Sequence, residues 1–93
     1  MSPVTTGTTT LTTTVRFYAA ARAAAGTETT TVDLPEGATV EDLLDTLRAA
    51  HDAEFTRVLL RCSYLLDEVA VRDTSVVVHD GAVLDVLPPF AGG

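Results

Sequence analysis

The sequence of 93 residues contains no lysine, no tryptophan and a single cysteine. One cysteine cannot form a disulfide within the chain, which favours a reducing compartment. Without lysine, the chain offers no side-chain amine to acylating chemistry. No apolar run approaches the roughly 20 residues that a membrane-spanning helix needs, and the first residues lack the basic and apolar segments of a secretory signal. We therefore expect a cytoplasmic protein that has no membrane partner.

Positive charge is also scarce, because six arginines stand against 13 acidic residues and the net charge is −7. Nucleic acids and anionic membranes both require a cationic surface, so neither is expected as a partner. An acidic surface instead suits docking onto an electropositive protein, where complementary charge speeds association.

The length of the chain allows one domain and leaves no room for a second. Threonine dominates the first residues, which show no hydrophobic periodicity, and we predict a disordered lead-in over residues 1–12. A folded domain is predicted over residues 13–87, and residues 88–93 are predicted to form a functional tail.

One main helix and several short strands are expected within the domain. Thr39 can cap the helix, whose apolar face comprises Val40, Leu43, Leu44 and Leu47. Residues 20–25 and a segment around Phe55 suit short helical turns. Strands are predicted over residues 14–19, 28–34, 62–66, 69–71, 75–78 and 83–87. Strands before and after a single main helix predict an α+β domain, with the helix packed across a mixed sheet.

Alternation along two of these strands predicts which side chains leave the core. In the first strand Val15 faces inward, so Tyr18 faces outward. In the last strand the charged Asp85 marks the outward face, and Leu87 lies on that face too, directly before the tail.

Motifs for catalysis within the domain are missing. The chain has no phosphate loop, dinucleotide fingerprint or nucleophile elbow. His51 and His79 have no partners at metal-ligand spacing, so no metal site is expected. Cys62 has no second cysteine nearby and is interpreted as a small core residue. Any chemistry is therefore expected at the terminal carboxylate.

The last six residues have an unusual composition, Pro88-Pro89-Phe90-Ala91-Gly92-Gly93. Two prolines end the preceding strand, because proline has no N–H for the ladder and fixes its own φ. Two glycines then give the least hindered and most flexible backbone available. An ordinary frayed terminus is polar, whereas this one follows an apolar strand without a linker.

Several segments together resemble the small subunit of molybdopterin synthase, a family of ubiquitin-like, β-grasp sulfur carriers. They are Val15-Arg16-Phe17-Tyr18-Ala19, the Ala19-x-x-Arg22-x-x-x-Gly26 spacing, the capped helix from Thr39, and Asp80-Gly81 leading to the Pro-Pro-x-x-Gly-Gly ending. The resemblance covers residues 13–93, and the ending is its most specific part. It departs from the family at Ala23, where relatives often carry an acidic residue, and at the Asp67-Glu68 turn, which often carries asparagine elsewhere.

This resemblance implies a function for the tail. A partner that resembles ubiquitin-activating enzymes would join the Gly93 carboxylate to AMP, using ATP and Mg²⁺, and the product would become a thiocarboxylate. The sulfur would then pass to a cyclic pyranopterin precursor in the large synthase subunit, within a heterotetramer. Pro88, Pro89, Phe90, Ala91 and Gly92 would thread the tail into both active sites. The resemblance also implies docking through Tyr18, Val71 and Leu87 and no cofactor bound by this chain itself.

Three alternatives remain open from the sequence. A ubiquitin-like modifier would use the same adenylation chemistry and transfer Gly93 to lysines of target proteins. A sulfur carrier for thiamine or cysteine synthesis would have a similar tail, although the Pro-Pro-Phe-Ala run resembles the molybdenum cofactor branch most. A plain binding domain would keep its function after losing both terminal glycines.

Overall fold

The computed structural model describes residues 10–89. The predicted lead-in up to residue 9 and the tail residues Phe90, Ala91, Gly92 and Gly93 lie outside the described part. The elements in chain order are β1 (Thr10–Phe17), α1 (Ala19–Ala25), β2 (Thr29–Pro35), α2 (Val40–Ala50), α3 (Ala53–Leu59), β3 (Ser63–Leu66), β4 (Val69–Ala70) and β5 (Val83–Leu87).

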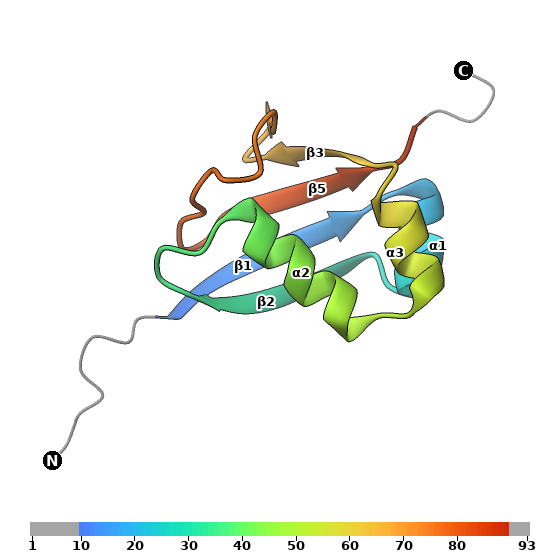
Figure 1. The fold of residues 1–93 in the computed structure, drawn as a ribbon, viewed down its shortest axis with the longest axis horizontal. Helices are drawn as coiled ribbons and strands as arrows, with labels where there is room; N and C mark the ends of the chain where they lie inside the picture. Colours follow the sequence, from blue (N-terminus) through green and yellow to red (C-terminus); the bar gives the residue numbers. More distant parts are fainter. Residues whose placement is uncertain (1–9, 90–93) are drawn as a thin grey trace, which may run out of the picture.

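The five strands form one mixed sheet in the order β2-β1-β5-β3-β4. β1 pairs antiparallel with β2 and parallel with β5, and β3 pairs antiparallel with both β5 and β4. α2 crosses one face of the sheet, while α1 and α3 lie together at one end (Figure 1). The prediction of an α+β domain with one main helix across a mixed sheet is confirmed.

The main helix forms for the reasons that the sequence indicates. The Thr39 hydroxyl accepts a hydrogen bond from the Asp42 N–H at 3.2 Å, and the Asp42 carboxylate accepts one from the Thr39 N–H at 2.9 Å. These reciprocal bonds satisfy donors that the first turn of a helix would otherwise leave unpaired. The predicted apolar face is buried against the sheet, namely Val40, Leu43, Leu44 and Leu47.

The first strand begins earlier than predicted. β1 starts at Thr10, within the segment assigned to the lead-in, and Leu11 is buried opposite Leu34 of β2. β-branched threonines fit a pleated strand well, and the apolar Leu11 gives this end of β1 a core contact. β1 therefore begins four residues before the strand predicted from residue 14.

The predicted strand over residues 75–78 is wrong. Its one sheet-like contact is an isolated bridge between Thr39 and Val77. The backbone of this stretch instead bonds to the start of α2, with Val40 N–H donating to the Val76 carbonyl and Val78 N–H donating to the Ala38 carbonyl, both at 2.9 Å. The three valines at residues 76–78 led to the wrong prediction, because only Val78 is buried.

An aromatic cluster fills the core where α3 meets the sheet. Phe17 and Phe55 are fully buried, with ring centroids 5.8 Å apart in an edge-to-face arrangement. The His51 ring stacks on Phe55 at 4.2 Å, and its Nδ1 lies 2.9 Å from the Leu47 carbonyl oxygen. His51 thus serves in aromatic packing and as a hydrogen-bond donor at the end of α2.

The turn between β3 and β4 holds two residues in the left-handed region, with φ of 49° at Asp67 and 71° at Glu68. A two-residue hairpin turn requires positive φ at both central positions, which favours glycine over glutamate. We expect Glu68→Gly to raise the free energy of unfolding by about 1 kcal/mol, since the strain relieved exceeds the entropy that glycine adds to the unfolded chain. Urea denaturation measures this, and Glu68→Ala, which keeps the strain, should show no gain.

His79 ties the loop before β5 to this turn. Its Nε2 lies 2.7 Å from the Asp67 carboxylate, and its Nδ1 lies 2.7 Å from the Asp80 carbonyl oxygen. The carbonyl of Asp80 first, and then the carboxylate of Asp67, raise the pKa of His79 above its ordinary value. The N–H of Val83, with smaller help from His79, lowers the pKa of Asp67.

These directions predict a pH dependence of stability. A raised histidine pKa stabilises the fold fully below the unfolded value of 6.5, and this contribution is lost as pH rises through the folded pKa. The free energy of unfolding should therefore fall as pH rises above 6.5, and the fall should be smaller in His79→Gln. The Asp67 carboxylate titrates at acid pH, where His79 is protonated throughout. The contributions of the two residues to the pH dependence of stability therefore fall in separate pH ranges. Equal pH profiles for the two proteins would contradict the prediction.

Candidate functional site: the tail base and the outer face of the sheet

The candidate site lies on the face of the sheet opposite α2, which we call the outer face. Val15 and Leu84 are paired in the buried core, so their neighbours Arg16 and Asp85 point to the outer face. These two residues are themselves direct partners in the parallel β1–β5 ladder. The register thus places a guanidinium beside a carboxylate at the centre of the sheet.

Arg16 and Asp85 form a two-pronged ion pair. Arg16 Nε donates to Asp85 Oδ1 at 2.6 Å, and Nη2 donates to Oδ2 at 3.1 Å. The Asp85 side chain is only 7% exposed, whereas that of Arg16 is 42% exposed. Hydrogen bonding to Asp85, and then its charge, raise the pKa of Arg16. The outward direction predicted for Asp85 is confirmed, but its burial was not foreseen.

Tyr18 completes this group at the end of β1. It is the residue before α1, its side chain remains partly exposed, and its hydroxyl donates to Asp85 Oδ1 at 3.4 Å. The prediction that Tyr18 leaves the core is confirmed.

An apolar hollow of about 570 Å³, which we call the tail-base hollow, opens beside Tyr18. It is lined by Tyr18, Ala19, Ala20, Ser63, Leu87, Pro88 and Pro89. The structure therefore brings together two of the residues predicted for docking and the two prolines predicted at the base of the tail. An apolar hollow of this kind can hold the side chains of a partner next to Pro88 and Pro89.

Val71, the third residue predicted for docking, lies elsewhere. Its N–H donates to the Tyr64 carbonyl at 2.9 Å, and its half-buried side chain packs against the core on the helix side of the sheet. It does not line the tail-base hollow. Alternation alone could not place it, because Val71 follows the two-residue strand β4.

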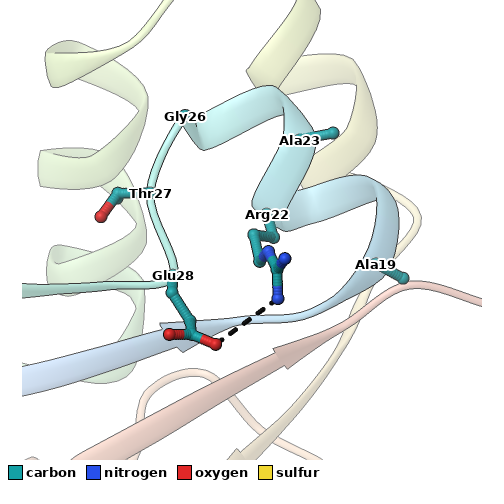
Figure 2. Close-up of a pocket in the computed structure, with 6 residues that line it drawn as sticks. All are labelled: Ala19, Arg22, Ala23, Gly26, Thr27 and Glu28. Carbon is teal, nitrogen blue, oxygen red and sulfur yellow. Dashed lines mark hydrogen bonds and ion pairs between the residues drawn. The ribbon is translucent and has the colours of Figure 1, made fainter.

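A second, larger hollow of about 790 Å³ is lined by residues of α1 and of the turn that leads to β2 (Figure 2). Figure 2 shows Arg22 reaching from α1 toward Glu28, with 3.4 Å between Nη1 and Oε2. Both side chains are well exposed, so this ion pair adds little stability. Gly26 ends α1 with φ of 78°, and its N–H donates to the Arg22 carbonyl. The Arg22-x-x-x-Gly26 spacing thus reflects a helix end that needs a left-handed residue.

Residues 10–89 contain no group of three or more His, Cys, Asp or Glu that could hold a metal ion. Burial raises the pKa of the Cys62 thiol, and its Sγ lies 3.2 Å from the Val58 carbonyl oxygen, which is the environment of an unreactive cysteine. Within the same residues, no helix is long and apolar enough to cross a bilayer.

The chain is similar to known proteins over most of its length. The model of the ThiS family matches residues 15–93. The molybdopterin synthase sulfur carrier subunit of Chlamydomonas reinhardtii is 35% identical over 80 residues, which cover 85% of this chain and 95% of that protein. The small archaeal modifier protein 1 of Haloferax volcanii superposes with a TM-score of 0.76 at 28% identity, over 86% of this chain and 99% of that structure.

Two more distant structures share the fold alone. One is a chain from the protein–protein complex of subunits 1 and 2 of the molybdopterin-converting factor of Helicobacter pylori, with a TM-score of 0.68 at 20% identity over 89% of this chain and 100% of that one. The other is a ubiquitin-like protein of Trypanosoma brucei, with a TM-score of 0.63 at 14% identity over 87% and 96% of the two chains. The predicted ubiquitin-like fold is thereby confirmed.

Proposed function

Because the chain belongs to the ThiS family, we propose that it is a sulfur carrier and the small subunit of a molybdopterin synthase. The observation that carries the proposal is the 35% identity to a molybdopterin synthase sulfur carrier subunit across almost the whole of that protein. The position of Pro88 and Pro89 at the rim of an apolar hollow supports it. The chain has no catalytic set of its own in this proposal and acts as the sulfur-donating subunit.

The proposed chemistry takes place at the Gly93 carboxylate. A carboxylate is a poor electrophile, so an adenylating partner similar to ubiquitin-activating enzymes joins it to AMP and releases pyrophosphate from ATP. Sulfide then attacks the acyl carbon, AMP leaves, and a thiocarboxylate remains; if the donor is a persulfide, a thiol must also cleave the acyl disulfide that forms first. ATP and Mg²⁺ belong to the partner, and this chain binds no cofactor. The sulfur finally passes to a cyclic pyranopterin, building the dithiolene that later holds molybdenum.

The composition of the tail suits this transfer. Gly92 and Gly93 have no side chains to clash in a narrow channel, and they tolerate the backbone angles that two different active sites impose. Pro88 and Pro89 restrict the base of the tail, which reduces the entropy lost when the tail enters a site. Phe90 and Ala91 connect the two prolines to the two glycines in the sequence.

The proposed partner at the outer face is the large synthase subunit, in a heterotetramer of two small and two large subunits. The complex of the two subunits reported for the Helicobacter pylori protein supports this choice. Tyr18 and Leu87 would contact the partner through the tail-base hollow. The excess of acidic residues would speed the encounter with an electropositive surface. We also propose a cytoplasmic location, in keeping with the free thiol of Cys62.

The docking proposal predicts the effect of Leu87→Ser. Leu87 is half-buried and lines the tail-base hollow, so a polar replacement should weaken binding of the large subunit about tenfold or more. Isothermal titration calorimetry measures the affinity. Val69→Ser is the matched control, because Val69 is 67% exposed and does not line the hollow. Equal losses for both variants would contradict docking at the hollow. Val71→Ala is tested in parallel. A lower affinity with unchanged stability would show a binding role for Val71, whereas a lower stability with unchanged affinity would show a packing role.

The sulfur-carrier proposal is tested by the intact mass of the protein after incubation with its adenylating enzyme, ATP, Mg²⁺ and a sulfur source. Replacement of one oxygen by sulfur should raise the mass, and deletion of Gly93 should prevent the increase. Transfer of that sulfur to the pyranopterin precursor by the large subunit then identifies the pathway. An unchanged mass, with an enzyme that activates another carrier under the same conditions, would exclude the carrier function.

A protein modifier is the second candidate, favoured by the 28% identity to small archaeal modifier protein 1. The same adenylate would then be attacked by a lysine amine of a target protein, with AMP as the leaving group. Mass spectrometry of target proteins decides between the two, because a modifier leaves Gly93 in an isopeptide bond and a sulfur carrier leaves none.

A further inference from the structure

We infer that Asp85 is a positioning residue of the docking surface, which acts through Tyr18. Its buried carboxylate, fixed by Arg16, orients the Tyr18 ring at the rim of the tail-base hollow. The inference rests on the proposed function, since it assumes that this hollow receives the large synthase subunit.

The first step is that the position of the carboxylate is fixed. Asp85 lies in β5, between β1 and β3, where it pairs with Arg16 on one side and Leu65 on the other. Both carboxylate oxygens accept from the Arg16 guanidinium, in a geometry that specifies direction as well as distance. The residue is 5% exposed, and a carboxylate at that depth must remain paired.

The second step is that the backbone does not fix the Tyr18 ring. Tyr18 lies one residue beyond β1, with φ of −125°, and the next residue, Ala19, has φ of 50°. The Tyr18 side chain makes no capping bond to α1. Among residues 10–89, its hydroxyl donates to Asp85 Oδ1, the same oxygen that accepts from Arg16 Nε. The bond of 3.4 Å is long for two oxygens, so it orients the ring with modest strength.

The third step connects orientation to binding. Tyr18 is 39% exposed and lines the tail-base hollow beside Leu87. A tyrosine ring that is already oriented loses less rotamer freedom when a partner docks than one that is free to rotate. Removing the acceptor should therefore weaken docking by roughly threefold to tenfold, without removing any atom that contacts the partner.

The alternative is that the Arg16–Asp85 pair serves the fold alone. That role predicts a lower midpoint of thermal unfolding in Asp85→Ala and an unchanged affinity for the large subunit. The two roles therefore differ in the affinity of the folded protein, measured well below the unfolding temperature.

The test is a double-mutant cycle on the affinity of the full-length chain for the large subunit, by isothermal titration calorimetry. Asp85→Ala, which removes both acceptor oxygens, and Tyr18→Phe should each weaken binding about threefold to tenfold, and the double variant should bind no more weakly than Asp85→Ala alone. Asp45→Ala is the control, since it removes an exposed carboxylate that is paired with Arg48. Unchanged affinity in Asp85→Ala, or losses that multiply in the double variant, would overturn the inference.

A second measurement needs no partner. In ¹³C-edited NMR, the Tyr18 ring should reorient faster in Asp85→Ala than in the wild-type chain, with the signals of Tyr64 unchanged, since the Tyr64 hydroxyl bonds to the Leu59 carbonyl. Identical Tyr18 signals would overturn the inference even if Asp85→Ala bound weakly. If the wild-type chain fails to bind the large subunit, the proposed function fails, while the NMR result still decides whether Asp85 orients Tyr18.

Discussion

Sulfur transfer should fall about a hundredfold or more when Gly93 is replaced by leucine, while the free energy of unfolding stays unchanged. In the proposed function, the reacting atoms are the carbonyl carbon of Gly93, which is attacked when sulfur is loaded, and the sulfur bonded to it, which attacks the pyranopterin. A leucine side chain at that position would displace the acyl group in any channel shaped for glycine, and a displacement of about 1 Å is enough for a loss of this size. Thiocarboxylate formation, followed by intact mass, and transfer to the pyranopterin, followed by product formation, measure the two steps separately.

Gly7→Leu provides the matched control for this experiment. It makes the same chemical change at a glycine that lies outside the family match over residues 15–93. We expect normal sulfur loading and transfer for this variant. If Gly93→Leu loaded and delivered sulfur at the wild-type rate, the tail would have no steric requirement at its last residue, and the threading mechanism would be excluded.

Phe55→Ala should lower the free energy of unfolding by about 3–5 kcal/mol. Phe55 is completely buried, contacts the Phe17 ring edge-on at 5.8 Å and stacks on His51 at 4.2 Å. Truncation would leave a cavity between α3 and the sheet and remove both aromatic contacts. Since domains of this size are stabilised by only about 5–15 kcal/mol in total, the variant should be partly unfolded at physiological temperature. Urea denaturation at 25 °C measures the loss.

The control for this prediction is Leu60→Ala, because Leu60 directly follows α3 in the chain but is 73% exposed. Its loss should stay within about 0.5 kcal/mol, as for other surface substitutions. A loss of similar size for Phe55→Ala and Leu60→Ala would show that the aromatic cluster is not the centre of the core.

Local patterns predicted much of this fold. The helix capped by Thr39 was recognisable because its cap and its apolar face lie within a dozen consecutive residues. The last strand was predicted at residues 83–87, where β5 is found, because Gly81 and Pro88 delimit it on either side. In both cases the information is local, and a single sequence contains it.

The failures involve information from distant parts of the chain. The valines at residues 76–78 fit a strand locally, but their backbone groups bond to the start of α2. Asp85 was predicted only to lie on the outward face of the sheet, and nothing within its strand indicated that it would be buried there. Its burial depends on the β1–β5 register, which brings Arg16 alongside from 69 residues away. Alternation within one strand contains no such register, so neither the ion pair nor its link to Tyr18 could be predicted.

The parallel pairing of β1 with β5 also affects the stage of synthesis at which the protein can fold. β5 lies between β1 and β3, so the sheet remains divided until a strand near the end of the chain takes its place. Contacts of such long sequence separation form slowly, because a large loop must close before they contribute. A chain interrupted during synthesis before residue 83 would lack the strand that joins the two halves of the sheet, and we expect it to stay unfolded and be degraded. A chain that folds has therefore been synthesised at least through β5, the strand to which the tail is attached.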